Sequence, residues 1–205
     1  AAAGGALGVR ILTFDDLYTE CLAAAGEVYT ELSEPVQYRL LRAIVDSLSL
    51  RHYASLTGRP GFIQALQRLI GELKAAQIYP EHFAASVQQM GDEARLQELA
   101  AIYLAYQQRL QDNGWADRAG LGWLSVEALA QRAPHVGRDW PLLAVDGFDD
   151  FTPIQAALLE LLAARVGEML ITLTGSVDGN RRPLVHRRFA RTRQILSAAL
   201  GVQAT

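Results

Sequence analysis

Hydrophobic residues recur at intervals of three and four along most of this chain, and glycine and proline interrupt the pattern at several points. That periodicity places the hydrophobic residues on one face of an α-helix. Thr13, Ser33 and Pro153 mark helix starts, because they are favoured at N-caps or in first turns. Helices are therefore predicted to begin at Thr13 and to span about residues 33–50, 62–73, 81–89, 92–113, 117–130, 153–162 and 185–200.

Three shorter segments have the composition of strands. They are Val9–Thr13, Leu142–Val145 and Met169–Thr174. The strands are too far apart in the sequence for tight βαβ repeats, because a helical block of about a hundred residues follows the first one. These elements predict an α/β fold in which a large all-helical insertion separates the strands of one parallel sheet.

Composition adds few constraints on function. Half of the 205 residues are hydrophobic, and no hydrophobic run approaches the roughly 20 residues of a membrane helix. The first residues lack the basic region of a signal peptide. The single cysteine, Cys21, excludes an internal disulfide framework, and its hydrophobic helical context predicts a buried core position. We therefore expect a cytoplasmic protein that has no membrane partner.

The net charge of −3 does not favour nucleic-acid binding, but the basic residues are unevenly distributed. Six arginines lie close together near the end of the chain: Arg181, Arg182, Arg187, Arg188, Arg191 and Arg193. Arginine binds phosphate through two parallel hydrogen bonds. A phosphate-binding face and a solvated helix face explain the cluster equally well. Arg187, Arg188 and Arg191 are the candidate DNA contacts.

Candidate chemistry follows the strand Leu142–Val145. Asp146 comes directly after it, and a helix is predicted to start at Pro153. Open α/β sheets bind ligands at the carboxyl ends of their strands, where one carboxylate can hold a magnesium ion beside a nucleotide. Asp146 is thus a candidate magnesium ligand. A residue that only caps a turn is the alternative.

This segment resembles the Walker B sequence of UvrD/Rep/RecB-type helicases, Val-Asp-Glu-Phe-Gln-Asp-Thr-Asn-x-x-Gln. The residues that match in register are Val145, Asp146, Phe148, Asp150 and Gln155. Gly147 stands where those helicases carry the catalytic glutamate, which orients the attacking water during ATP hydrolysis. Glycine has no side chain to perform that task, so the resemblance implies a degenerate site.

The variant Asp-Gly-Phe-x-x-Phe-Thr-Pro at residues 146–153 is similar to the AddB subunit of AddAB-type helicase–nucleases, whose helicase half is degenerate. The resemblance spans nearly the whole chain. It implies a partial RecA-like sheet of the P-loop NTPase type, formed by residues 1–32 and 136–205. Residues 33–135 would then form the helical insertion subdomain.

The segment Ile11–Leu17 resembles the Thr-Phe-His segment of the same helicase superfamily. In the family the threonine contacts the DNA backbone, so Thr13 is a weak candidate DNA contact. A threonine N-cap explains the residue equally well. Asp15 stands in place of the usual histidine and would repel phosphate. This departure argues against ordinary tracking of the protein along a DNA strand.

The chain has no Gly-x-x-x-x-Gly-Lys-Ser/Thr loop to bind nucleotide phosphates. The glutamine that senses the γ-phosphate in active helicases is also missing after Thr174. The resemblance therefore implies a fragment that holds no ATP or magnesium by itself, with Asp146 as a vestigial ligand. A full-length parent could bind both. The four histidines lack metal-ligand spacing, and no nuclease signature occurs.

We expect a catalytically inactive, helicase-like module of a bacterial subunit for DNA double-strand-break repair and recombination. It would guide single-stranded DNA and dock a partner helicase–nuclease subunit. Two alternatives stay open: a fragment of an active DNA-dependent ATPase or helicase, and a helical scaffold that binds only protein. Gly147 argues against the first, and a continuous basic stripe on the surface would argue against the second.

Overall fold

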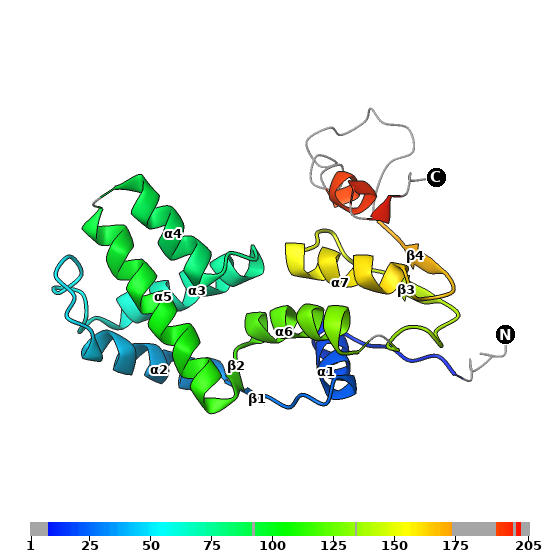
Figure 1. Ribbon diagram of the computed structural model, residues 1–205, viewed down its shortest axis with the longest axis horizontal. Helices are drawn as coiled ribbons and strands as arrows, with labels where there is room; N and C mark the ends of the chain where they lie inside the picture. Colours follow the sequence, from blue (N-terminus) through cyan, green and yellow to red (C-terminus); the bar gives the residue numbers. More distant parts are fainter. Residues whose placement is uncertain (1–7, 92, 134, 174–191, 199, 202–205) are drawn as a thin grey trace.

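The structure, a computed structural model, describes residues 8–91, 93–133, 135–173, 192–198 and 200–201. The described residues form two lobes that lie side by side (Figure 1). The helical lobe comprises α2 (Glu34–Ser47), α3 (Pro60–Ala75), α4 (Pro80–Met90) and α5 (Ala94–Asn113). The sheet lobe comprises α1 (Phe14–Ala24), α6 (Arg118–Gln131), β3 (Leu143–Val145), α7 (Pro153–Ala163) and β4 (Met169–Ile171).

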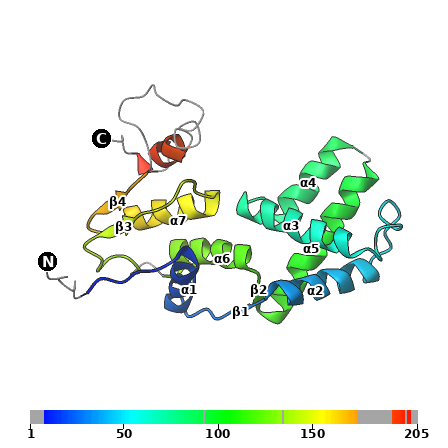
Figure 2. The ribbon, with the colours of Figure 1, turned by 180° about the vertical axis from the view of Figure 1, so that it is seen from behind.

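Two short connections join the lobes, and Figure 2 shows them from behind. They contain the strands β1 (Thr30–Glu31) and β2 (Trp115–Ala116), which pair in parallel. These strands were not predicted from the sequence, because two residues are too few to show a period of two. Among the described residues, no helix is both long enough and apolar enough to span a bilayer.

The predicted helices are confirmed where the structure describes them. Thr13 and Thr152 are the N-caps of α1 and α7, and each forms a complete capping box. Gly114 ends α5 with φ 63° and ψ 33°, a left-handed conformation that glycine adopts without strain. Only residues 192–198 and 200 of the predicted last helix lie within the described residues, and they are helical.

Helix α6 is the element around which the sheet lobe packs. It contacts α1 on one side and α7 on another, and it also touches α3 of the helical lobe. A side chain at Gly122 would prevent this packing, because a Cβ there would lie 2.8 Å from Cγ2 of Ile154 and 3.3 Å from Cζ of Tyr18. Although α6 falls inside the predicted insertion, it therefore packs with helices from both flanking segments. The division into domains itself stays a prediction.

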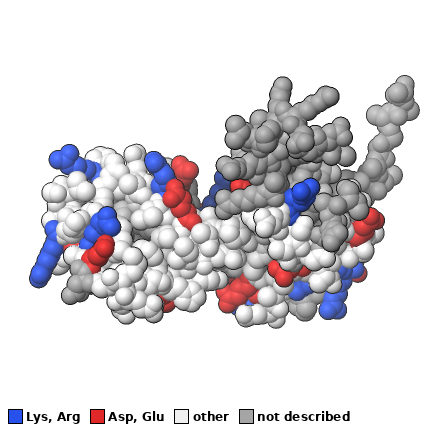
Figure 3. Space-filling view, turned by 90° about the horizontal axis from the view of Figure 1, so that it is seen from above, with Lys and Arg blue, Asp and Glu red and all other residues white. Residues whose placement is uncertain are grey.

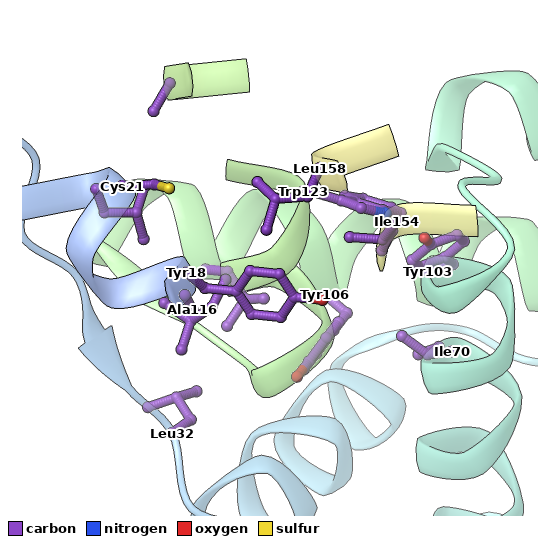
Figure 4. Close-up of a cluster of buried hydrophobic side chains, with 14 of the residues drawn as sticks. Tyr18, Cys21, Leu32, Ile70, Tyr103, Tyr106, Ala116, Trp123, Ile154 and Leu158 are labelled. Carbon is purple, nitrogen blue, oxygen red and sulfur yellow. The ribbon is translucent and has the colours of Figure 1, made fainter. Parts of the chain in front are cut away.

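The main core is formed by buried side chains of α1, α2, α3, α5, α6 and α7, and Figure 4 shows part of it. Cys21 is fully buried, as predicted, and burial raises the pKa of its thiol to about 11. Tyr103 and Tyr106 of α5 are each only 1% exposed. Both tyrosines thus have the core role that their helical spacing predicts, and they are not exposed stacking surfaces.

The predicted sheet is only partly correct. β3 and β4 pair in parallel, with Val145 opposite Ile171, but the predicted strand Val9–Thr13 is not a strand. Strand-forming residues stabilise a sheet only when their side chains pack against neighbours, and Ile11 is 94% exposed. The described part of the chain thus has a helix-dominated mixed architecture with two short parallel sheets.

Candidate functional site

Asp146 lies at the carboxyl end of β3, as predicted. Its Oδ1 accepts a hydrogen bond from the hydroxyl of Thr172. The backbone N–H of Thr172 donates to the carbonyl oxygen of Val145 at 3.0 Å, so this contact extends the β3–β4 ladder by one residue. Asp146 is exposed to solvent. The strand expected on the other side of β3, at Val9–Thr13, is absent from the described sheet.

Gly147 has φ +81°, a conformation that favours glycine. A Cβ added there would have no heavy atom within 4 Å, so backbone conformation and not crowding restricts this position. The position where related helicases carry a water-orienting carboxylate is therefore an open turn without a side chain.

The other matched residues of the Walker B-like segment stabilise the turn and the following helix. Asp150 Oδ1 accepts hydrogen bonds from the Phe151 N–H at 2.9 Å and from the Thr192 hydroxyl at 3.4 Å. Gln155 and Thr152 form the capping box of α7, in which Gln155 Oε1 accepts from the Thr152 N–H at 2.9 Å. The geometry of Asp150 and Gln155 thus has a local structural explanation.

The structure brings the start of α1 next to the turn after β3. The Phe14 ring lies 5.1 Å from that of Phe148 and 6.1 Å from that of Phe151, both edge-to-face. Phe151 is buried, whereas Phe14 and Phe148 are half-buried. Two segments that are distant in the sequence, one beginning with Thr13 and one with Asp146, therefore meet at a partly exposed aromatic group.

Thr13 is engaged in the cap of α1. Its N–H and its hydroxyl both donate to Oδ2 of Asp16, at 2.8 and 2.7 Å, and its hydroxyl accepts from the Asp16 N–H at 3.2 Å. These bonds hold the pKa of Asp16 below its usual value, the backbone donor having the larger effect. Arg187, Arg188 and Arg191, the other candidate DNA contacts, lie outside the described residues.

That Asp146 is only a vestigial magnesium ligand stays a prediction, because one carboxylate can be enough for magnesium beside a nucleotide. Among the described residues, no group of three or more His, Cys, Asp or Glu side chains is placed to hold a metal ion. Asp146 follows β3 directly, and Gly147 beside it offers no second ligand. Asp150 is engaged with Phe151 and Thr192.

The surface charges of the described residues are mixed. In the view of Figure 3, Lys and Arg side chains form separate groups with Asp and Glu side chains between them. No continuous basic stripe crosses the described residues on that face. A cleft of about 870 Å³ between the lobes is likewise mixed, with Glu31 and Glu34 facing Arg68 and Arg118 among its lining residues.

A buried polar network joins the lobes, and it was not predicted from the sequence. Lys74, the only lysine of the chain, is fully buried, and its Nζ lies 2.7 Å from Oδ2 of Asp117. The same oxygen accepts from the Tyr106 hydroxyl at 2.9 Å, and Oδ1 accepts from the Gly120 N–H at 2.6 Å. Trp123 completes the network, since its Nε1–H donates to the Lys74 carbonyl at 2.7 Å.

Burial determines the electrostatics of this network. Burial lowers the pKa of Lys74, and the Asp117 carboxylate opposes that shift. Burial likewise raises the pKa of Tyr106, and Asp117 adds to that rise. A lone lysine inside a hydrophobic stripe of α3 was the one sequence signal that could have indicated a buried partner.

Comparison with known proteins agrees with these observations. The family model described as ADDB, N-terminal, matches residues 1–202. The B subunit of the ATP-dependent helicase/deoxyribonuclease from Moorella thermoacetica is 30% identical over 203 residues, which cover 90% of this chain and 16% of the relative. The protein of the same name from Thermoanaerobacter sp. is 29% identical over 143 residues, 68% of this chain and 12% of the relative.

A third relative with that name, from Acetivibrio thermocellus, is 24% identical over 185 residues, which cover 86% of this chain and 16% of the relative. This chain therefore spans between 12% and 16% of the length of these three proteins. The resemblance inferred from the Asp146–Pro153 segment is confirmed. Because the family match extends over nearly every residue, this chain belongs to the AddB N-terminal family.

Proposed function

We propose that this chain is a non-catalytic, helicase-like module of a cytoplasmic helicase–nuclease subunit for DNA repair. In this role it contacts single-stranded DNA at the carboxyl edge of β3. The observation that carries the proposal is the composition of that edge. Gly147 replaces the water-orienting carboxylate, and the half-buried rings of Phe14 and Phe148 lie next to it.

Aromatic rings suit a DNA contact that does not require catalysis. Bases of single strands stack on exposed aromatic side chains, and each such stack contributes about 1–3 kcal/mol. The acidic Asp15 and Asp16 beside Phe14 disfavour a phosphate at the start of α1. The candidate contacts for the backbone phosphates are therefore Arg187, Arg188 and Arg191, which lie outside the described residues.

The test is a fluorescence-anisotropy titration of a labelled single-stranded oligonucleotide at several salt concentrations. We expect weak binding, with a log–log salt slope of about −0.7 for each phosphate neutralised. Phe148→Ala should weaken binding about fivefold or more, from the loss of one stack. Phe83→Ala is the matched control, because Phe83 is also half-buried but lies in α4 of the helical lobe.

Absence of binding at low salt would leave a protein-binding scaffold as the better description. The same holds if Phe148→Ala and Phe83→Ala behave alike. Reversal of charge at Arg188 and Arg191 should weaken binding and lower the salt slope, since phosphate contacts are lost.

A second test addresses ATP hydrolysis. We expect no release of phosphate from ATP in the presence of single-stranded DNA, because neither the phosphate loop nor the γ-phosphate-sensing glutamine is in the sequence. Gly147→Glu should not create activity, since the new side chain would be strained at φ +81°. Turnover of about 1 per second or more that Asp146→Ala abolishes would contradict the proposal.

A further inference from the structure

A small pocket on the helical side of α6 differs in chemistry from the rest of the described surface. It has a volume of about 90 Å³ and is formed by the start of α4, the end of α5, β2 and α6. The aromatic, acidic and amide side chains that line it are Tyr79, Glu81, Gln107, Trp115, Trp123 and Glu127. We call it the aromatic pocket. It lies apart from the carboxyl edge of β3, and none of the residues discussed there lines it.

The aromatic side chains of the pocket are held in place. Trp123 stacks on Tyr79 with ring centroids 4.6 Å apart, and its Nε1–H is bonded to the Lys74 carbonyl. Tyr79 is 41% exposed and Trp115 is half-buried. The rings that remain partly open to a ligand are therefore those of Tyr79 and Trp115, because Trp123 is buried and already has Lys74 Nζ 5.4 Å from its ring centroid.

The charge of the pocket is negative. Glu81 and Glu127 are exposed, and neither takes part in an ion pair within the described residues. Lys74, the one cation among the described residues that line the pocket, is already balanced by Asp117 at 2.7 Å. Two uncompensated carboxylates thus remain beside aromatic rings, a combination that attracts a cation.

The pocket also contains an acceptor without a donor. Oε1 of Gln107 is buried and has no hydrogen-bond partner among the described residues. Buried polar atoms are nearly always paired in folded proteins, and an unpaired one is costly. Gln107 lines the pocket, so a ligand with an N–H group would have to reach this buried atom from the pocket side.

We propose that the aromatic pocket binds one arginine side chain of a protein partner. A guanidinium group is planar and can stack on an aromatic ring, and its five N–H donors can serve Gln107 and the two carboxylates together. Its size also suits the pocket, because about 90 Å³ is several times the roughly 10–15 Å³ of cavity that one water molecule needs. A phosphate or a nucleic-acid backbone is excluded by the charge of Glu81 and Glu127.

This inference goes beyond the proposed DNA contact and is independent of it. The pocket has no residue in common with the aromatic group at Phe148, and it selects the opposite charge. Failure at one site therefore leaves the other untouched. A partner that inserts arginine here would contact α4, α5 and α6, and so would span both lobes.

The experiment is a titration of the 205-residue chain with the peptide acetyl-Gly-Arg-Gly-amide, followed by tryptophan fluorescence and by the indole N–H signals in NMR. A Trp140→Phe background leaves only the two pocket tryptophans, Trp115 and Trp123, as reporters. The matched probe is the peptide with citrulline, which has the shape of arginine without its charge. We expect saturable binding of the arginine peptide and none of the citrulline peptide.

Two double variants locate the binding. Glu81→Gln/Glu127→Gln should weaken binding about tenfold or more, because it removes two charge-assisted interactions. Glu160→Gln/Glu168→Gln makes the same change of charge at exposed positions that do not line the pocket, and it should leave binding unchanged. All four glutamates are exposed, and thermal unfolding measured by circular dichroism would show that both variants are folded.

Several results would overturn the proposal. These are the absence of saturation, equal binding of the citrulline peptide, and an unchanged affinity in Glu81→Gln/Glu127→Gln. Equal binding of acetyl-Gly-Lys-Gly-amide would contradict the choice of arginine. Displacement of the peptide by a single-stranded oligonucleotide would place nucleic acid in the pocket and would also contradict it. If the double variant does not fold, the comparison of arginine with citrulline on the unaltered pocket decides.

Discussion

Asp117 and Asp146 each directly follow a strand of a short parallel pair, β2 in one case and β3 in the other. Their surroundings differ. Asp117 is 6% exposed and binds Lys74, the Tyr106 hydroxyl and the Gly120 N–H. Asp146 is exposed and binds the Thr172 hydroxyl.

The comparison shows that an acid at the end of a parallel strand does not by itself indicate a ligand site. At Asp117 three donors, one each from α3, α5 and α6, bind the carboxylate and thereby connect the two lobes. Asp146 is exposed, and the neighbouring Gly147 adds no side chain beside it. The difference comes partly from Lys74 and Tyr106, which are distant in the sequence, and partly from the local N-cap of α6 at Asp117.

The largest effect should follow from Asp117→Ala. Removal of one partner from a buried ion pair leaves Lys74 uncompensated, and we expect a loss of about 3–5 kcal/mol in the free energy of unfolding. Asp146→Ala should cost less than about 1 kcal/mol, because one exposed hydrogen bond is lost. Urea unfolding followed by circular dichroism measures both.

Replacement of both partners provides the control. Lys74→Met/Asp117→Leu should recover part of the loss, because no buried charge remains. Equal destabilisation by Asp117→Ala and Asp146→Ala would remove the distinction between the two regions.

Substitution of two glycines should give the next largest difference in the free energy of unfolding. Gly120→Ala should destabilise the fold by about 1–3 kcal/mol, since its Cβ would lie 2.8 Å from Oδ1 of Asp117. Gly71→Ala is the matched substitution within α3, where a Cβ meets no atom within 4 Å. It should stabilise the helix by about 0.5–1 kcal/mol. Thermal unfolding of the two variants should therefore shift in opposite directions, and a shift in the same direction would contradict the crowding at Asp117.

The caps of the sheet lobe should have smaller effects. Thr152→Ala removes the side-chain cap of α7 and should cost about 1 kcal/mol. Thr57→Ala is the control, because the Thr57 hydroxyl donates to the Ala54 carbonyl in an exposed turn. If Thr152→Ala has no more effect than Thr57→Ala in urea unfolding, the capping role of the Thr152–Gln155 pair is wrong.

The smallest effect concerns Asp16 and pH. Hydrogen bonds from the backbone N–H and then the hydroxyl of Thr13 lower the pKa of Asp16 below 3.8. Its contribution to stability is thus fully present above pH 3.8 and is lost as the pH falls through the lower, folded-state pKa. Asp16→Asn removes this contribution, so the difference between the unfolding midpoints of the two proteins should be present at pH 7 and should shrink as the pH falls below 3.8. A constant difference over that range would contradict the assignment.

The sequence predicted the local features of the fold well. Helix starts at Thr13 and Thr152–Pro153 and the end at Gly114 depend on interactions within one turn, which a linear pattern contains. The strand at Val9–Thr13 failed for the opposite reason. A strand depends on a neighbour elsewhere in the chain, and the hydrophobic composition of Val9 and Ile11 does not reveal whether one is present.

In the candidate site, too, local features could be predicted from the sequence and long-range contacts could not. Asp146 and Gly147 were located from the sequence because the whole motif is contiguous. The Lys74–Asp117 pair joins residues 43 positions apart, and the Phe14–Phe148 contact joins two different segments. Without an indication of which helices pack together, neither contact could be read from the order of residues.

The packing of α1 against α6 has a consequence for synthesis of the protein. The two helices end at Ala24 and Gln131, so α1 leaves the ribosome long before its main partner is complete. At translation rates of about 5–20 residues per second, this delay amounts to roughly 5–20 s. During that time Leu17, Cys21 and Leu22, which are all buried in the finished core, have no α6 to cover them. The nascent chain therefore exposes a free thiol and the hydrophobic face of α1. A chaperone could shield both until residue 131 has emerged.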